Sequence, residues 1–182
     1  MVQPQQPDDV KLICGMISAE VGLFGDAAEK LAAAFGPIDL ESEVMDFNFT
    51  HYYDEEMGCP LYRRFLAFEP LVSPDVLIEA KCLTNALESA FAAGSGAGPA
   101  RRINLDPGYI TSAKLVLASM KNFSHRIYLG RGVYGEVTLM WRKGRWQALP
   151  WTFPDYASGA YHGFLTEARR CLSRGGVKES VS

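Results

Sequence analysis

The stretch Lys11-Leu-Ile-Cys-Gly-Met-Ile-Ser-Ala19 decides the fold, together with the helical repeat that follows it. A short apolar run of this kind, bounded by polar residues, is typical of a buried strand. In residues 22–35, apolar side chains recur at helical spacing, and Gly36-Pro37 ends the repeat. The folded part of the chain therefore begins with a buried strand followed by an amphipathic helix.

The next elements repeat this alternation. Residues 38–49 and 61–69 are predicted strands, and 101–105 is a short third one. Between the last two, Ser73-Pro74-Asp75 is a helix start, and an apolar stripe continues to Phe91. The resulting order of strand, helix, strand, strand, helix, strand predicts a ferredoxin-like βαββαβ core, with two helices on one face of an antiparallel sheet.

The second half leaves one segment open. Residues 106–120 form either a helix capped by Asp106-Pro107, which we favour, or a strand entered by a turn at Pro107-Gly108. Residues 125–129, 133–141 and 145–149 are predicted strands, and 161–172 a final helix. The predicted fold class is α+β, with a ferredoxin-like core extended by a C-terminal β-meander and helix. It forms one domain over residues 10–173, and 1–9 and 174–182 are expected to be flexible termini.

Composition excludes several classes of function. The 182 residues carry a formal net charge of −3, which argues against a general nucleic-acid binder. The sequence has no apolar run long enough to cross a membrane and no signal peptide at its start, so we expect a cytoplasmic protein without a membrane partner. The four cysteines are dispersed along the chain, so we expect reduced thiols and no metal site. No motif in the sequence identifies a cofactor.

The segment Gly130-Arg-Gly-Val-Tyr-Gly-Glu-Val137 matches the pattern G-x-G-x-x-G-x-V. A protein-kinase interpretation fails, because the lysine strand, the catalytic loop and the magnesium-binding motif of kinases are all missing. A P-loop motif is also missing. We favour a glycine-rich hairpin turn, and the alternative is a phosphate-cradling loop in another fold.

Polar side chains gather near the ends of several predicted strands. Arg102 and Asn104 share one face of a strand by alternation, and Asp106 continues that face. Such a face binds an anion or polarises a carbonyl, unless Arg102 is a solvated edge residue or is paired with Asp106. His51 and Glu55 are four residues apart, which fits either a metal ligand pair or, as we favour, a polar surface loop.

Two further groups each have a functional and a structural interpretation. His125 and Glu136 fall in adjacent predicted strands, where they meet either as a general acid/base pair or as a structural hydrogen-bonded pair. Trp151, Pro154 and Tyr156 either line a pocket or pin the last helix to the sheet.

The sequence resembles a known prokaryotic family, the domain of unknown function 4416, over roughly residues 10–173. The matching stretches are Asp39–Glu43, Tyr52-Tyr53 with Glu56-Met57-Gly58, Pro60–Phe65, Asn104–Tyr109, His125–Gly130 and Pro150–Tyr156. Members of that family are sometimes labelled GTP-binding proteins, although this chain has neither a phosphate loop nor the N-K-x-D guanine motif. The resemblance implies no catalytic residue.

We therefore expect a cytoplasmic protein that binds a small anionic metabolite, such as a nucleotide or phosphate ester, with turnover left open. The expected catalytic residues are His125, Glu136 and Asp106. The expected ligand-binding residues are Arg63, Arg64, Arg102, Asn104, Lys114, Arg126, Tyr128, Trp151 and Asp155. The alternative is a non-catalytic interaction module that forms a homodimer through an open sheet edge, motivated by an aromatic content of 12%.

Overall fold

The chain folds around an antiparallel sheet with helices packed on both of its faces. The computed structural model describes residues 3, 5–50, 54–93 and 101–174. The strands are β1 (Val10–Ser18), β2 (Ile38–Glu41), β3 (Met45–Asp46), β4 (Tyr62–Val72), β5 (Ile103–Ile110), β6 (Lys114–Ser119), β7 (Ile127–Gly130), β8 (Val133–Arg142) and β9 (Arg145–Ala148). The helices are α1 (Leu23–Phe35), α2 (Asp54–Met57), α3 (Val76–Ala93), α4 (Pro154–Ala157) and α5 (His162–Arg174).

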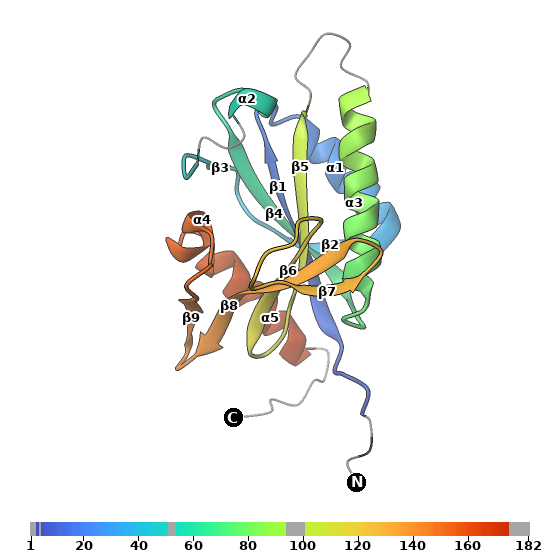
Figure 1. Cartoon of the computed structure of the whole chain (residues 1–182), viewed down its shortest axis with the longest axis vertical. Helices are drawn as coiled ribbons and strands as arrows, with labels where there is room; N and C mark the ends of the chain where they lie inside the picture. Colours follow the sequence, from blue (N-terminus) through green and yellow to red (C-terminus); the bar gives the residue numbers. More distant parts are fainter. Residues whose placement is uncertain (1–2, 4, 51–53, 94–100, 175–182) are drawn as a thin grey trace.

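The strands follow the order β2-β4-β1-β5-β6-β8-β7, and all pairs are antiparallel. The short strands β3 and β9 pair with β4 and β8, respectively. The strand predicted over 38–49 is thus divided into β2 and β3. Figure 1 shows that β7 and β8 run across the lower part of the molecule, at a steep angle to β1 and β5.

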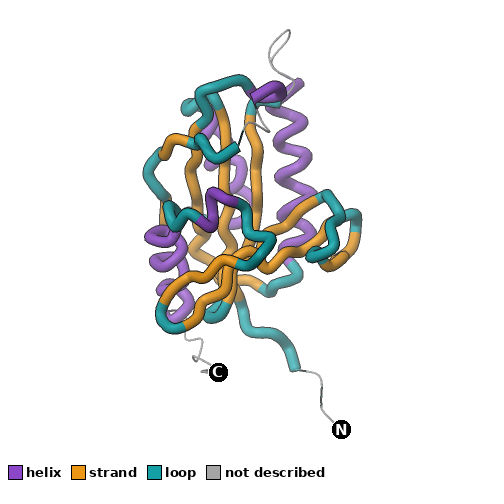
Figure 2. Tube along the Cα trace, turned by 60° about the vertical axis from the view of Figure 1, so that its left-hand side comes forward, coloured by secondary structure: helices purple, strands orange, loops and turns teal. Residues whose placement is uncertain are grey.

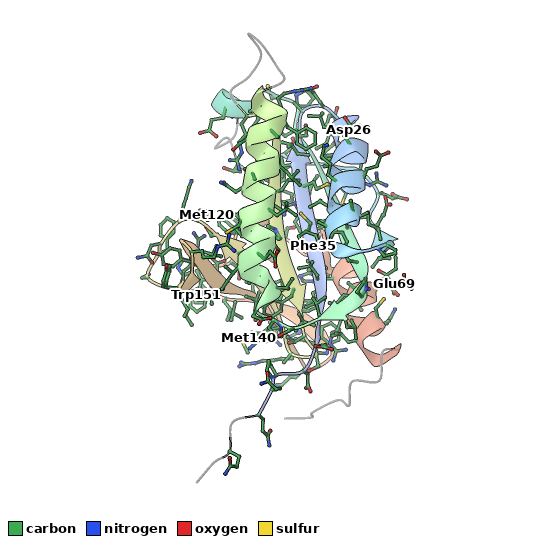
Figure 3. The ribbon with its side chains drawn as sticks, turned by 90° about the vertical axis from the view of Figure 1, so that its right-hand side faces the viewer. Asp26, Phe35, Glu69, Met120, Met140 and Trp151 are labelled. Carbon is green, nitrogen blue, oxygen red and sulfur yellow. The ribbon has the colours of Figure 1, made fainter. Side chains whose placement is uncertain are left out.

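Two layers of helices cover opposite faces of the sheet. Helices α1 and α3 pack on one face (Figure 3). Leu31 and Ala80 are buried there against the strands. Helix α5 packs on the other face, where Leu165 and Ala168 join a second core cluster. Every residue of β1 is buried, because this strand lies between both layers, and this explains its continuous apolar run.

The helix favoured for residues 106–120 is wrong, because the segment forms the end of β5 and the whole of β6. Pro107 is tolerated within β5 because β6 pairs with β5 only from Gly108 to Ile110. Gly108 is required by close packing, since a Cβ atom there would lie 2.6 Å from the carbonyl oxygen of Val116. The apolar residues of this segment therefore belong to two strands and pack on both faces of the sheet. They do not form one apolar stripe of a helix.

The limited pairing between β5 and β6 leaves residues 103–107 of β5 without a strand on that side. Side chains of α3 take the place of the strand. The carboxylate of Glu88 accepts the backbone N–H of Leu105 at 2.7 Å, and the ammonium group of Lys81 donates to its carbonyl at 2.9 Å. The sheet is thus capped here by two oppositely charged side chains.

The C-terminal strands are joined by tight hairpins, which Figure 2 shows in the lower half of the molecule. The β7–β8 turn has positive φ at Arg131 (53°) and Gly132 (79°), as a primed turn requires. The glycine-rich motif therefore forms a hairpin, as favoured above. The predicted C-terminal meander and final helix are also present, as β7 to β9 and α5. No helix in the described part of the chain is long and apolar enough to span a bilayer.

Candidate functional site

Two polar clusters lie beside the sheet. The central cluster consists of Arg63, Asp106, Asp155 and Tyr156, with Asn104, Lys81, Glu88 and Arg101 joined to it. The edge cluster consists of His125, Arg126, Glu136 and Trp151, with Phe123 beside it. The segment 150–156 contacts both clusters, through Trp151 at one end and Asp155 and Tyr156 at the other.

Arg63 is the buried centre of the first cluster, with 2% of its side chain exposed. Its guanidinium donates to the Tyr156 hydroxyl at 2.7 Å and lies 3.5 Å from a carboxylate oxygen of Asp155. Aromatic rings surround it, the nearest being Phe65, whose ring centre is 4.7 Å away. Gly15 makes this possible, because a Cβ atom there would lie 2.6 Å from a guanidinium nitrogen of Arg63.

The central cluster continues along β5 toward α3. The Asn104 side chain donates to Asp106 at 2.7 Å, and its amide oxygen Oδ1 accepts a hydrogen bond from Arg101. Asp106 also lies 3.7 Å from the ammonium group of Lys81. Asn104 and Asp106 thus share one face of the strand, as their alternation predicts.

Charge in the central cluster is balanced. Its cations are Arg63, Lys81 and Arg101, and its acids are Asp106, Asp155 and Glu88. Burial raises the pKa of Asp155 and that of Glu88, although cations lie beside both. The ion pairs and hydrogen bonds of this network join α3, β5 and α4.

The edge cluster is built on Glu136, whose side chain is 2% exposed. One carboxylate oxygen accepts from Arg126 at 2.8 Å and lies 2.9 Å from Nε2 of His125. An ionised carboxylate only accepts hydrogen bonds, so Nε2 carries the proton. In the neutral imidazole, Nδ1 is then the atom that accepts a proton. The predicted contact between His125 and Glu136 is confirmed.

Aromatic rings enclose His125 on both sides. Its ring stacks on Trp151 with centres 5.4 Å apart and on Phe123 with centres 5.9 Å apart. Both outer rings reach solvent, with 38% of Trp151 and 55% of Phe123 exposed. Arg126 is fixed in turn, because it donates to Ser119 and to the carbonyl of Lys121.

Trp151 and Thr152 also complete the sheet at this edge. Strand β7 pairs with the start of β8 and β9 with its end, so two carbonyls between them lack a strand partner. The Trp151 indole donates to the Val137 carbonyl at 2.8 Å, and the Thr152 hydroxyl to the Thr138 carbonyl at 2.6 Å. Trp151 and Tyr156 therefore fit the pinning interpretation, since both attach the segment before α5 to the sheet.

In the described part of the chain, the other predicted ligand-binding residues form no hydrogen bond or ion pair with either cluster. Arg64 pairs with Glu41. Arg102 precedes β5 and pairs with Glu20, so Arg101 joins Asn104 in its place. Lys114 begins β6, and Tyr128 is an exposed residue of β7. His51 and the side chain of Glu55 lie outside the described residues.

Sequence reasoning missed Lys81 and Glu88, and a signal for them was present. Leu77, Lys81, Thr84 and Glu88 follow helical spacing, so three polar residues continue the buried stripe of α3. Polar residues at such positions need partners, and in this chain the partners are the β5 backbone and Asp106. Among the described residues, no group of three or more His, Cys, Asp or Glu could hold a metal ion.

The fold and these two clusters define an α+β protein with an antiparallel sheet and two polar clusters beside it. The model of one protein family, described as Domain of unknown function (DUF4416), matches residues 8–171. The chain belongs to this family. Searches of curated proteins and of solved structures found no match to this chain.

Proposed function

We propose that the protein binds a small anionic metabolite with a planar ring, of which a nucleotide is the type, at the edge cluster. The single observation that carries this proposal is the partly exposed His125 ring, held by the buried Glu136 between two exposed aromatic rings. The hydrogen bond to Glu136 fixes the imidazole, and Nδ1 has no hydrogen-bond partner among the described residues. Such an arrangement is more typical of a functional site than of an ordinary solvated surface.

The aromatic rings supply the binding surface for the planar part of the ligand. Phe123 and Trp151 are already parallel to His125, so their exposed surfaces extend a stack that a nucleobase can join. Other contacts hold both rings in place. The Trp151 indole is hydrogen-bonded to β8, and the guanidinium of Arg126 lies over the Phe123 ring. The rings therefore need little reordering when a ligand arrives, which favours affinity.

Charge supplies the preference for an anion. Arg126 and Glu136 neutralise each other, so protonation of His125 leaves the cluster with one net positive charge. A phosphate or carboxylate group is thus favoured beside a planar ring.

Turnover, if the bound molecule reacts, would use Nδ1 of His125 as the proton acceptor. Glu136 would hold the imidazole in the required tautomer, and the hydrogen bond from Arg126 would fix the position of Glu136. Asp106, the third residue expected to be catalytic, belongs to the central cluster and has no part in this step.

Isothermal titration calorimetry of the purified chain tests this proposal with ATP, GTP, AMP, ribose 5-phosphate and inorganic phosphate. We expect the nucleotides to bind, and we expect His125→Gln to weaken nucleotide binding at least about tenfold, because the imidazole that stacks on Phe123 and Trp151 is lost. Phe123→Leu should weaken the binding of nucleotides but not that of ribose 5-phosphate. Arg64→Gln is the matched control, since Arg64 already pairs with Glu41. The absence of binding by all five compounds, or equal affinity of the His125 variant, would refute the proposal.

A second candidate function rests on a different observation. Strand β7 lies at the end of the sheet, and its Ile127, Tyr128 and Leu129 are 72%, 60% and 40% exposed. An apolar edge strand of this kind fits a homodimer, in which the β7 strands of two copies pair. Sedimentation velocity tests it: wild type should be a dimer and Ile127→Lys a monomer, and a monomeric wild type at all concentrations would exclude it.

Two finer assignments also belong to this proposal. The order β2-β4-β1-β5, with α1 and α3 on one face, supports a ferredoxin-like arrangement in the first half of the chain. The buried, unpaired thiol of Cys14 supports a reducing compartment such as the cytoplasm.

A further inference from the structure

The β8–β9 hairpin concentrates positive charge at an exposed tip. Its sequence is Trp141-Arg142-Lys143-Gly144-Arg145-Trp146, in which the four residues between the tryptophans are all exposed. Trp141 pairs with Trp146, and their ring centres are 5.2 Å apart. Both tryptophans pack on the core beneath α5. The arginines next to them in the strands therefore point to the opposite face of the sheet.

The pairing of the two arginines is unfavourable for the isolated protein. Arg142 lies directly opposite Arg145, and like charges at such positions destabilise a hairpin. Neither arginine forms an ion pair with an acid in the described part of the chain. Lys143 has a φ of 52°, a conformation that asparagine or glycine adopts at lower cost. Folding alone does not explain three cations at this turn.

A neighbouring strand adds a fourth cation on the same face. Lys114 of β6 lies opposite Met140, which is two residues before Arg142 in β8, so the side chains of all three share one face. On the other face, the guanidinium of Arg169 lies over the Trp141 ring at 4.5 Å and braces the hairpin against α5. The basic hairpin surface, defined as Lys114, Arg142, Lys143 and Arg145, thus spans three neighbouring elements in a chain of net charge −3.

We propose that the basic hairpin surface binds the phosphodiester backbone of a single-stranded nucleic acid. Phosphate groups would sit between Arg142 and Arg145 and relieve their repulsion. Affinity for a backbone of this kind depends on the cations that meet it and the counterions they release, so the net charge of the chain does not oppose it.

The chemistry of the surface favours nucleic acid over an anionic membrane. Amphipathic membrane surfaces combine cations with apolar side chains that insert between lipids. The large apolar side chains that are exposed in the described residues lie elsewhere, at positions 21, 44, 49, 120, 123, 127–129, 151 and 153. Met140, between the cations, is only partly exposed. The surface thus offers charge without an inserting group.

Fluorescence anisotropy of a labelled, short, single-stranded oligonucleotide with the full chain tests this proposal. We expect binding at low ionic strength. If all four cations contact phosphates, the logarithm of the binding constant should fall with the logarithm of the salt concentration with a slope of about −3. Arg142→Gln/Arg145→Gln should weaken binding about tenfold or more and reduce the magnitude of the slope by about 1.4. Arg64→Gln/Arg102→Gln is the matched control, because both of these arginines are already paired with glutamates and should leave binding unchanged.

Thermal unfolding separates loss of binding from loss of structure. The Tm of Arg142→Gln/Arg145→Gln should be equal to or above that of wild type, since the repulsion is removed. Lys143→Asn should likewise keep or raise the Tm while weakening the binding of the oligonucleotide. Absence of binding at low salt, equal weakening by the control pair, or binding only to phosphatidylserine vesicles would overturn the proposal. The last outcome would assign the surface to a membrane.

Discussion

The carboxylate of Glu88 accepts the backbone N–H of Leu105 at 2.7 Å, so a helix side chain stands where a strand backbone would otherwise pair. Lys81, seven residues earlier on the same helix, donates to the carbonyl of the same residue. The two side chains satisfy both polar groups of Leu105 and join α3 to the uncovered side of β5. The position of α3 is therefore set by polar contacts as well as by its apolar stripe.

Removal of the Glu88 carboxylate should destabilise the protein. In Glu88→Ala, the buried N–H of Leu105 loses its acceptor and Arg101 loses an ion-pair partner. We expect the free energy of unfolding to fall by about 1–3 kcal/mol, as measured by urea denaturation. Asn85→Ala on the exposed side of α3 is the control and should change stability by less than about 0.5 kcal/mol. Equal effects of both variants would show that Leu105 gains nothing from Glu88.

Two glycines should respond in opposite directions to alanine. A Cβ atom at Gly15 would lie 2.6 Å from Arg63 and 2.9 Å from the Phe65 ring, both of which are buried. We expect Gly15→Ala to cost about 1–3 kcal/mol through overpacking. Gly25 lies in α1 with open space around it, so Gly25→Ala should stabilise by about 0.4–1 kcal/mol. Thermal melts of both variants measure the difference, and equal shifts in Tm would contradict it.

The sequence predicts the first half of the fold because local and tertiary signals agree there. The stretch around Cys14 is apolar throughout, and in the structure it is the strand buried between two layers. The helix from Leu23 to Phe35 begins and ends within a residue of its prediction, since Gly36 stops it. Over residues 106–120 the signals conflict, because the spacing of Ile110, Leu117 and neighbouring apolar residues fits a helix while their burial on both sides requires strands.

The candidate site was only partly predictable for a similar reason. His125 lies two residues before β7, and the hairpin that pairs β7 with β8, which the turn residues reveal in the sequence, brings it to Glu136. The partners of Arg63 are not revealed in this way, because Asp106 and Asp155 reach it from distant segments. Long-range pairing of charges leaves no periodic pattern, so the sequence indicated Arg63 as a cation without its buried neighbours.

Arg63 should be needed chiefly as the partner of buried acids. In Arg63→Met, the carboxylate of Asp155 keeps its buried position and loses its nearest cation, so we expect a loss of about 3–5 kcal/mol. Asp155→Asn removes that charge, and the double variant should be more stable than the sum of the single effects predicts. Urea denaturation of the four proteins gives the coupling energy. Strict additivity would mean that the two side chains do not interact.

Asp155 should also make stability depend on pH in a particular direction. Burial raises its pKa above the ordinary value of 3.8, so the folded state binds the proton more tightly than the unfolded state does. Its contribution to stability is therefore greatest at acid pH, and declines as the pH rises from near 3.8 through the raised pKa. Asparagine does not titrate, so the stability of wild type relative to Asp155→Asn should fall across this range. Urea denaturation of both proteins at a series of pH values measures that difference, and a difference that rises with pH would show that Arg63 holds the carboxyl ionised in spite of its burial.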